Sequence, residues 1–226
     1  MNTLFKSFGI KITIIIMVFF VSLTSLRAQS NQFTFVFLNK KPDADKISKE
    51  QSDKIMEGHM ANINRLAKED KLIAAGPFDG GGGIFVFKSS SIEQVKEWLA
   101  TDPGIQAKRW NIEILPYQPI INSICKVGEP YQMISYQFIR FWPEIKKFTV
   151  NDAPTLIAQH EEYWKNQHGK KALISFASFK ETNGDILISA EPMDESVIVN
   201  DPAIQVGLIR FEKKTLWIAK GSFCEK

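Results

Sequence analysis

One arrangement of residues, present twice, most constrains the fold of this chain. The segment from His59 to Pro103 reads helix, strand, glycine-rich turn, strand and helix, and a weaker copy of it runs from His160 to Pro202. The interval between His59 and Asp102 nearly equals the interval between His160 and Asp201. A repeat of only two copies favours two packed domains over a solenoid.

Strands flank the first copy and complete one structural unit. Ser48 and Gln51 have the spacing of a capping box, which predicts the start of a helix. The order β-α-β-β-α-β is that of a ferredoxin-like unit. We expect a strand at 32–38, a helix that begins after Ser48, strands at 72–78 and 84–88, a helix at 89–103 and a strand at 109–117.

The second copy follows the same order with a shorter second helix. Asn151 or Asp152 is suited to cap its long helix, and Gly169 to end it. We expect a strand at 131–142, a helix at 150–169, strands at 171–179 and 186–190, a short helix at 191–202 and a strand at 203–223.

The first strand carries apolar residues on both faces, with Phe33, Phe35 and Phe37 on one side and Val36 and Leu38 on the other. Helices cover only one face of each sheet, so the other face needs a partner. The sequence therefore predicts an α+β fold in which two ferredoxin-like units pack sheet to sheet as a pseudo-dimeric α+β barrel. We expect a signal peptide at 1–28, a first domain at 29–118, a linker at 119–130 and a divergent second domain at 131–226.

The N-terminus is typical of a secretory signal. Lys6 and Lys11 precede an apolar run from Ile12 to Leu23, and Ala28 offers a cleavage point. The run is short of the roughly 20 residues that span a bilayer. We expect an exported protein, periplasmic or secreted, without stable membrane insertion after cleavage near Ala28. The signal carries three positive charges, equal to the formal net charge of +3, so the mature chain is near neutral and a nucleic-acid partner is not expected.

Only two cysteines occur, Cys125 and Cys224. They lie just before the first and just after the last predicted strand of the second unit, and those strands are neighbours in a ferredoxin-like sheet. This placement predicts a Cys125–Cys224 disulfide, which export permits; the alternative is two free thiols. Because C-x-x-C spacing is absent, thioredoxin-like chemistry and structural zinc are not expected.

The histidine and aspartate of each copy are the candidates for chemistry. His59 lies along the apolar stripe of its helix, where a histidine can act as a base near neutral pH if a polar group orients it. The alternative is a core histidine bonded to a backbone carbonyl. Asp102 could orient His59 or accept a proton, or it could simply form a turn with Pro103. His160 and Asp201 are the weaker pair.

Glycines and histidines elsewhere bear on ligand and metal binding. Gly76-Pro77 breaks a strand where a backbone could approach a ligand closely, so both residues are candidates for a ligand cleft. The glycines at 80–83 lack the Gly-Lys-Ser/Thr ending of a phosphate loop and favour a hairpin. The three histidines are widely spread, so no metal site and no bound cofactor are expected.

Residues 32–117 resemble the YCII-related family. The matching elements are FTFVFL, His59, LIAAGPF with its Gly-Pro, IFVF, and ATDP, which contains Asp102. The resemblance implies a dimeric α+β barrel, similar to that of muconolactone isomerases and a dehydrochlorinase, with His59 and Asp102 as the active-site pair. The second copy has Ala177-Ser178 in place of Gly76-Pro77, which implies that its site is altered or lost.

Three functions are compatible with these observations. The first is a lyase or isomerase that acts on a small aromatic or lactone-like compound, with His59 as general base and Asp102 fixing its tautomer. The second is a non-catalytic module that binds an apolar small molecule. The third is a haem-handling barrel in which a histidine is the axial ligand. We expect a monomeric pseudo-dimer or a homodimer.

Overall fold

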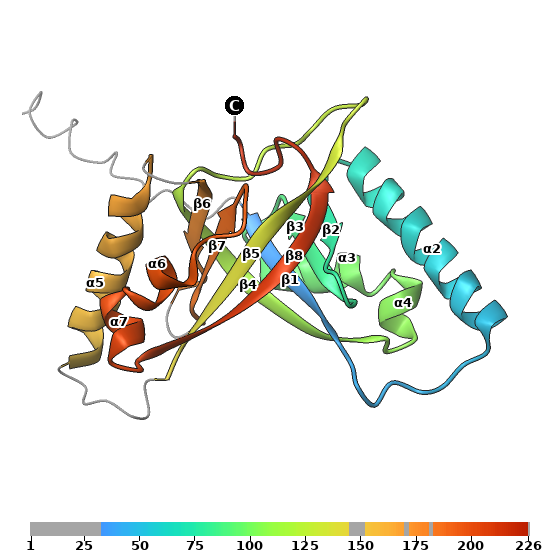
Figure 1. Cartoon of the computed structure of the whole chain (residues 1–226). Helices are drawn as coiled ribbons and strands as arrows, with labels where there is room; N and C mark the ends of the chain where they lie inside the picture. Colours follow the sequence, from blue (N-terminus) through green and yellow to red (C-terminus); the bar gives the residue numbers. More distant parts are fainter. Residues whose placement is uncertain (1–32, 145–151, 170–171, 181–182, 226) are drawn as a thin grey trace, which may run out of the picture. The chain divides into compact units, whose positions relative to one another are not determined.

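Strand β1 (Phe33–Lys40) begins the described part of the chain. A computed structural model describes residues 33–144, 152–169, 172–180 and 183–225 (Figure 1). The expected signal peptide and the capping candidate Asn151 lie outside these residues. Within them, no helix combines the length and the apolar composition needed to cross a membrane.

The first half follows the predicted order, with one added helix. Ser48 and Gln51 form the capping box that starts helix α2. Pro103 begins a short helix of its own and does not simply end the previous one, because the Asp102 side chain caps it. After β1 come α2 (Lys49–Lys68), β2 (Leu72–Pro77), β3 (Gly83–Phe87), α3 (Ile92–Leu99), α4 (Pro103–Gln106) and β4 (Trp110–Ile121).

The second half repeats this order. Its predicted short helix at 191–202 ends at Val199, because Asp201 caps a separate helix that begins at Pro202 and occupies the start of the strand predicted at 203–223. The elements are β5 (Met133–Pro143), α5 (Asp152–Gln167), β6 (Leu173–Ser178), β7 (Asp185–Ser189), α6 (Glu195–Val199), α7 (Pro202–Gln205) and β8 (Ile209–Ala219).

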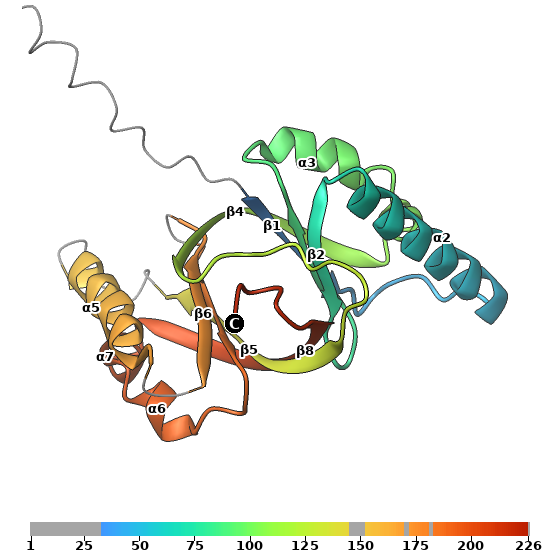
Figure 2. The same ribbon diagram turned by 90° about the horizontal axis from the view of Figure 1, so that it is seen from above.

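The two sheets join into one eight-stranded antiparallel sheet. The strand order is β2-β3-β1-β4-β6-β7-β5-β8, so each half keeps the ferredoxin-like arrangement and the halves meet where β4 pairs with β6. Strand β4 continues through Ile121, into the expected linker at 119–130, to make this pairing. The two ends of the sheet meet through a bridge between Phe78 and Leu216. Figure 2 shows the resulting ring of strands with the helices outside it.

Three apolar clusters hold this arrangement together. The inner cluster fills the ring with side chains from both halves, among them Phe35, Phe138 and Phe179. One outer cluster lies under α2 and α3 and the other under α5 and α6. Both faces of β1 are buried, as its sequence predicts, because Val36 belongs to an outer cluster and Phe35 to the inner one.

Cys125 and Cys224 form a disulfide, with a Cα–Cα distance of 5.1 Å. The backbone nitrogen of Cys125 also donates to the carbonyl oxygen of Ser222 at 2.9 Å. Phe223, next to the disulfide, is completely buried in the inner cluster. The bond therefore ties the connection between the halves to the C-terminal segment.

Gly76 lies where the two ends of the sheet meet. A Cβ atom at this position would be 2.5 Å from the carbonyl oxygen of Trp217 and 3.0 Å from Cβ of Ile218. Only a residue without a side chain lets β8 approach β2 so closely. The ligand role predicted for Gly76 and Pro77 is tested by no contact in this structure and stays a prediction.

We predict that Gly76→Ala lowers the free energy of unfolding by about 1–3 kcal/mol, because the new methyl group meets backbone atoms of β8 that cannot move freely. Gly128→Ala is the matched control, since a Cβ there meets nothing within 4 Å and its backbone lies outside the left-handed region. Urea unfolding of both variants measures the effect. Equal stabilities for the two variants would contradict a close contact at Gly76.

Candidate active site

Helix α2 presents His59 to the interior of the first half. His59, Asn62 and Leu66 are the buried residues of this helix. Their spacing of three and four residues places them on one face. The His59 side chain packs near Phe85 of β3 and Trp110 of β4, with ring centroids 5.7 and 4.8 Å apart. The histidine therefore lies between the helix and the sheet.

Asp102 reaches the same place from the turn between α3 and α4. As the N-cap of α4, its Oδ1 accepts from the backbone nitrogens of Gly104 at 2.9 Å and Ile105 at 3.2 Å. Helices α2 and α4 approach closely, because a Cβ at Gly58 would be 2.8 Å from Cγ of Pro103. Local capping therefore fixes the carboxylate, and helix packing brings it to His59.

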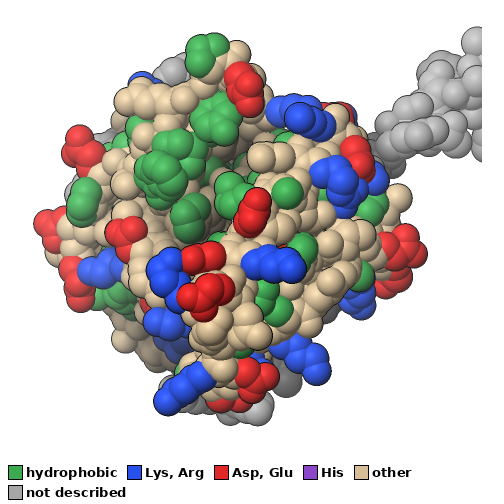
Figure 3. Space-filling view, turned by 90° about the vertical axis from the view of Figure 1, so that its right-hand side faces the viewer, with side chains coloured by type: hydrophobic (Ala, Val, Ile, Leu, Met, Phe, Trp, Pro, Cys, Tyr) green, Lys and Arg blue, Asp and Glu red, His purple; other side chains and the backbone are tan. Residues whose placement is uncertain are grey.

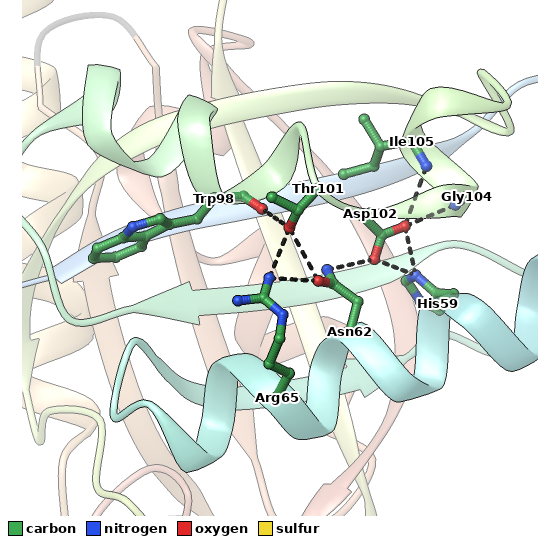
Figure 4. Close-up of polar contacts among 8 residues, drawn as sticks. All are labelled: His59, Asn62, Arg65, Trp98, Thr101, Asp102, Gly104 and Ile105. Carbon is green, nitrogen blue, oxygen red and sulfur yellow. Dashed lines mark hydrogen bonds and ion pairs between the residues drawn. The ribbon is translucent and has the colours of Figure 1, made fainter.

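The two side chains form a buried hydrogen-bonded pair (Figure 4). Nδ1 of His59 lies 2.8 Å from Oδ2 and 3.0 Å from Oδ1 of Asp102. Asn62 Nδ2 donates to Oδ2 at 3.1 Å. Burial raises the pKa of Asp102, but the hydrogen bond and charge of His59 and the bonds from Asn62 and Ile105 outweigh it, so the net pKa is lowered. The carboxylate is thus held ionised beside the imidazole.

A second layer of polar contacts holds Asn62. Its Oδ1 accepts from Nη2 of Arg65 at 2.8 Å and from the hydroxyl of Thr101 at 3.0 Å. The Thr101 hydroxyl also lies 2.7 Å from the carbonyl oxygen of Trp98 (Figure 4). This network fixes the Asn62 amide so that its nitrogen faces Asp102. Sequence reasoning missed Asn62, although its position three residues after His59 places it on the same helix face.

The two ring nitrogens of His59 have different surroundings. With Nδ1 donating to Asp102, Nε2 is the acceptor nitrogen of the neutral ring. Nε2 has no hydrogen-bond partner among the described residues, yet it is not one of the fully buried polar atoms. The residue is 5% exposed, and no histidine is visible on the face that carries α2 (Figure 3). Of the two ring nitrogens, Nε2 is therefore the one that remains to accept a hydrogen bond or a proton from another molecule.

The second pair has the same bond but a closed environment. His160 Nδ1 is hydrogen-bonded to Asp201, which caps α7 by accepting from the backbone nitrogen of Ala203 at 2.9 Å. Nε2 of His160 is fully buried and lies 3.6 Å from Oδ2 of Asp185, too far for a hydrogen bond. Burial raises the pKa of Asp185. Tyr163 occupies the position that Asn62 has in the first half, and its hydroxyl donates to a backbone oxygen.

No group of three or more histidine, cysteine or acidic side chains in the described part of the chain has the geometry to hold a metal ion. His59 lines neither the small cavity at the mouth of the barrel nor the larger one beside β5 and β8. The structure thus brings together the predicted His59 and Asp102, and separately His160 and Asp201.

We predict that Asp102→Asn lowers the free energy of unfolding near neutral pH by about 2 kcal/mol, because a charged hydrogen-bond acceptor is lost from a buried network. The lowered pKa of Asp102 gives stability that is present above its ordinary pKa of 3.8 and lost as the pH falls through the folded-state value. The difference in the free energy of unfolding between the parent and Asp102→Asn should therefore become smaller at acidic pH. Urea unfolding across this pH range measures it.

Asp53→Asn is the control for this prediction. Asp53 is likewise hydrogen-bonded to a side chain, that of Lys49, but it is 62% exposed, and exposed pairs contribute little. If Asp102→Asn is no less stable than Asp53→Asn at neutral pH, the network at His59 does not stabilise the fold.

Comparison with known proteins matches one family model to the first half of the chain. The YCII-related domain model matches residues 33–118, and no curated protein matches the chain. Among solved structures, an anthrone oxidase-like protein has a TM-score of 0.49 at 10% identity, with 84% of this chain and 92% of that chain covered.

A chlorite dismutase variant from Candidatus Nitrospira defluvii, solved with cyanide, has a TM-score of 0.49 at 8% identity, with 85% of this chain and 92% of that one covered. A siroheme decarboxylase has a TM-score of 0.43 at 7% identity, with 83% and 71% covered. Identities this low say nothing about a shared reaction. The matched segment contains both His59 and Asp102, and residues 33–118 are a YCII-related domain.

Proposed function

We propose that the YCII-related domain catalyses proton transfer on a small molecule, with His59 as the general base. The observation that supports this is the asymmetry of the His59 ring. Nδ1 is held by an ionised carboxylate at 2.8 Å, while Nε2 has no partner among the residues that the structure describes and is not fully buried. A neutral imidazole with a fixed tautomer and one free acceptor nitrogen is suited to accept a proton.

The chemistry follows from these two atoms. Nε2 accepts a proton from a carbon next to a carbonyl group, and the resulting imidazolium is stabilised by Asp102. Return of the proton to another carbon gives an isomerase, whereas departure of a leaving group from the neighbouring carbon gives a lyase. Phe85 and Trp110 beside the His59 ring favour a substrate with an apolar or aromatic part. Asn62 acts as a positioning residue through Asp102.

A non-catalytic binding module is the second candidate. It is favoured by the low exposure of His59, 5%, and by the second pair, where the same His–Asp bond is sealed from solvent. The residues around His59 do not fit a haem, because its ring already packs against Phe85 and Trp110.

We infer that the second half is a divergent copy whose role is to complete the barrel. Its strand order matches that of the first half, and it supplies β6 and β8 to the junctions between the halves. The buried Nε2 of His160 leaves no accessible acceptor there. On this proposal the domains at 29–118 and 131–226 act as a pseudo-dimer, with chemistry confined to the first.

Export is a further part of the proposal. It rests on the charged and apolar pattern of residues 1–28, and the Cys125–Cys224 disulfide suits an oxidising compartment. We predict that the protein recovered from outside the cytoplasm begins near Gln29, as N-terminal sequencing would show. Recovery of the chain only in the cytoplasm with Met1 retained would contradict export.

The function can be tested without knowing the substrate. We predict that parent protein in D2O introduces deuterium next to the carbonyl of at least one compound in a library of small lactones and aromatic ketones, as mass spectrometry would detect. Because Nε2 of His59 is the base, His59→Gln should lower the exchange rate at least about 100-fold.

His160→Gln is the matched control and should keep the exchange rate, because Nε2 of His160 is sealed from solvent. Exchange that survives in His59→Gln would overturn the assignment of the base. If the parent binds a library compound in a thermal-shift assay but exchanges none, the binding module is the better description.

A further inference from the structure

Arg140 lies in the mouth of the barrel, away from the His59 site. It belongs to β5, where its neighbours Ile139 and Phe141 face an outer cluster and Phe138 faces the inner one. Alternation along the strand therefore turns Arg140 inward. The residue is only 4% exposed. A permanent cation at the end of an otherwise apolar interior needs an explanation.

Aromatic rings hold the guanidinium on two sides. Its central carbon lies 4.3 Å from the ring centroid of Phe37 and 4.4 Å from that of Phe179. Trp142 lies at 5.3 Å. Although burial lowers the pKa of Arg140 to about 10, the group is charged at neutral pH. The rings thus fix the plane of the guanidinium and leave recognition to its N–H groups.

The hydrogen bonds of Arg140 are incomplete. Nη2 donates to Oε2 of Glu113 at 3.1 Å and to the carbonyl oxygen of Asn183 at 2.9 Å. Nε and Nη1 are buried and have no hydrogen-bond partner among the described residues. Leaving buried charged donors unpaired is costly, so an acceptor that pairs them would be bound favourably.

A small cavity adjoins Arg140 and is also lined by Phe37, Glu113 and Lys214. Its volume is about 20 Å³, enough for one or two atoms of water size. It reaches the surface, because the side chains of Glu113 and Glu212 on its rim are 42% and 50% exposed. Nζ of Lys214 lies 3.4 Å from Oε2 of Glu212 and offsets the negative charge of that carboxylate. This space alone is too small for a carboxylate group, which fits only by taking the place of the Glu113 carboxylate, with the rest of its molecule extending outward.

From this geometry we propose that the barrel mouth at Arg140 binds the carboxylate group of a small organic acid. The carboxylate of Glu113 already accepts a hydrogen bond from Nη2 of Arg140, which indicates that a carboxylate group is a suitable ligand for this site. A planar carboxylate matches the guanidinium fork better than a spherical halide does. Since Glu113 is reached from the surface, an incoming carboxylate replaces it at Nη2 and also pairs one of the two nitrogens, Nε or Nη1, that have no partner among the described residues.

The test uses sodium acetate as the probe, with sodium chloride at equal ionic strength as the reference. We expect acetate to shift the Arg140 Nε–H resonance saturably in NMR spectra, with a Kd on the order of 1 mM, and to raise the melting temperature as a ligand of the native state does. Chloride should do neither. An equal response to both salts, or none to acetate, would overturn the proposal and leave water as the occupant.

Three variants complete the experiment. Arg140→Met should abolish the acetate-dependent rise in melting temperature, whereas Arg210→Met should keep it, because Arg210, which lies over the Trp142 ring, is 57% exposed and pairs with Glu144. Glu113→Gln removes the competing carboxylate and should tighten acetate binding about tenfold. A misfolded variant would not bind acetate more tightly, so this increase in affinity tests the proposal even if Arg140→Met fails to fold. Weaker binding in Glu113→Gln would contradict the proposal.

Discussion

The need to bury both faces of two sheets governs this structure. Each half covers one face of its sheet with helices and leaves the other face rich in large apolar side chains, such as Phe35 in the first half and Phe138 in the second. The two inner faces exclude water only by facing each other. Pairing of β4 with β6 and the bridge between Phe78 and Leu216 then close the ring of strands around this shared core.

The same local motif serves stability and chemistry in the candidate site. An Asp-Pro turn starts a short helix in both halves, and the capping carboxylate bonds a histidine from the long helix. The halves differ in what surrounds the other ring nitrogen. Nε2 of His59 is not fully buried in the first half, whereas Nε2 of His160 in the second is fully buried and lies near Asp185. A His–Asp bond alone is thus a structural device, and access to Nε2 decides whether it can act as a base.

Residue spacing alone was enough to predict the local features of this protein. Capping and hydrophobic periodicity depend on neighbours in the chain, so they could predict the capping box at Ser48 and the order of strands and helices. Spacing also singled out His59 and Asp102, because their interval recurs between His160 and Asp201. The proximity of Cys125 and Cys224, which lie just before β5 and just after β8, could also be predicted, because these two strands are neighbours in a ferredoxin-like sheet. The helices that begin at Pro103 and Pro202 could not, because either proline could also end the preceding helix.

Contacts between distant segments became known only from the folded chain. Strand β4 extends to Ile121 because β6 is there to pair with it, and Gly76 is needed because β8 approaches it from the other half. The burial of Arg140 and the contrast between the two Nε2 atoms depend likewise on side chains from several elements. The pattern of apolar residues along the sequence specifies which face of a helix or strand a residue occupies. The side chains that this face contacts are determined by packing, since each such contact joins residues far apart in the chain.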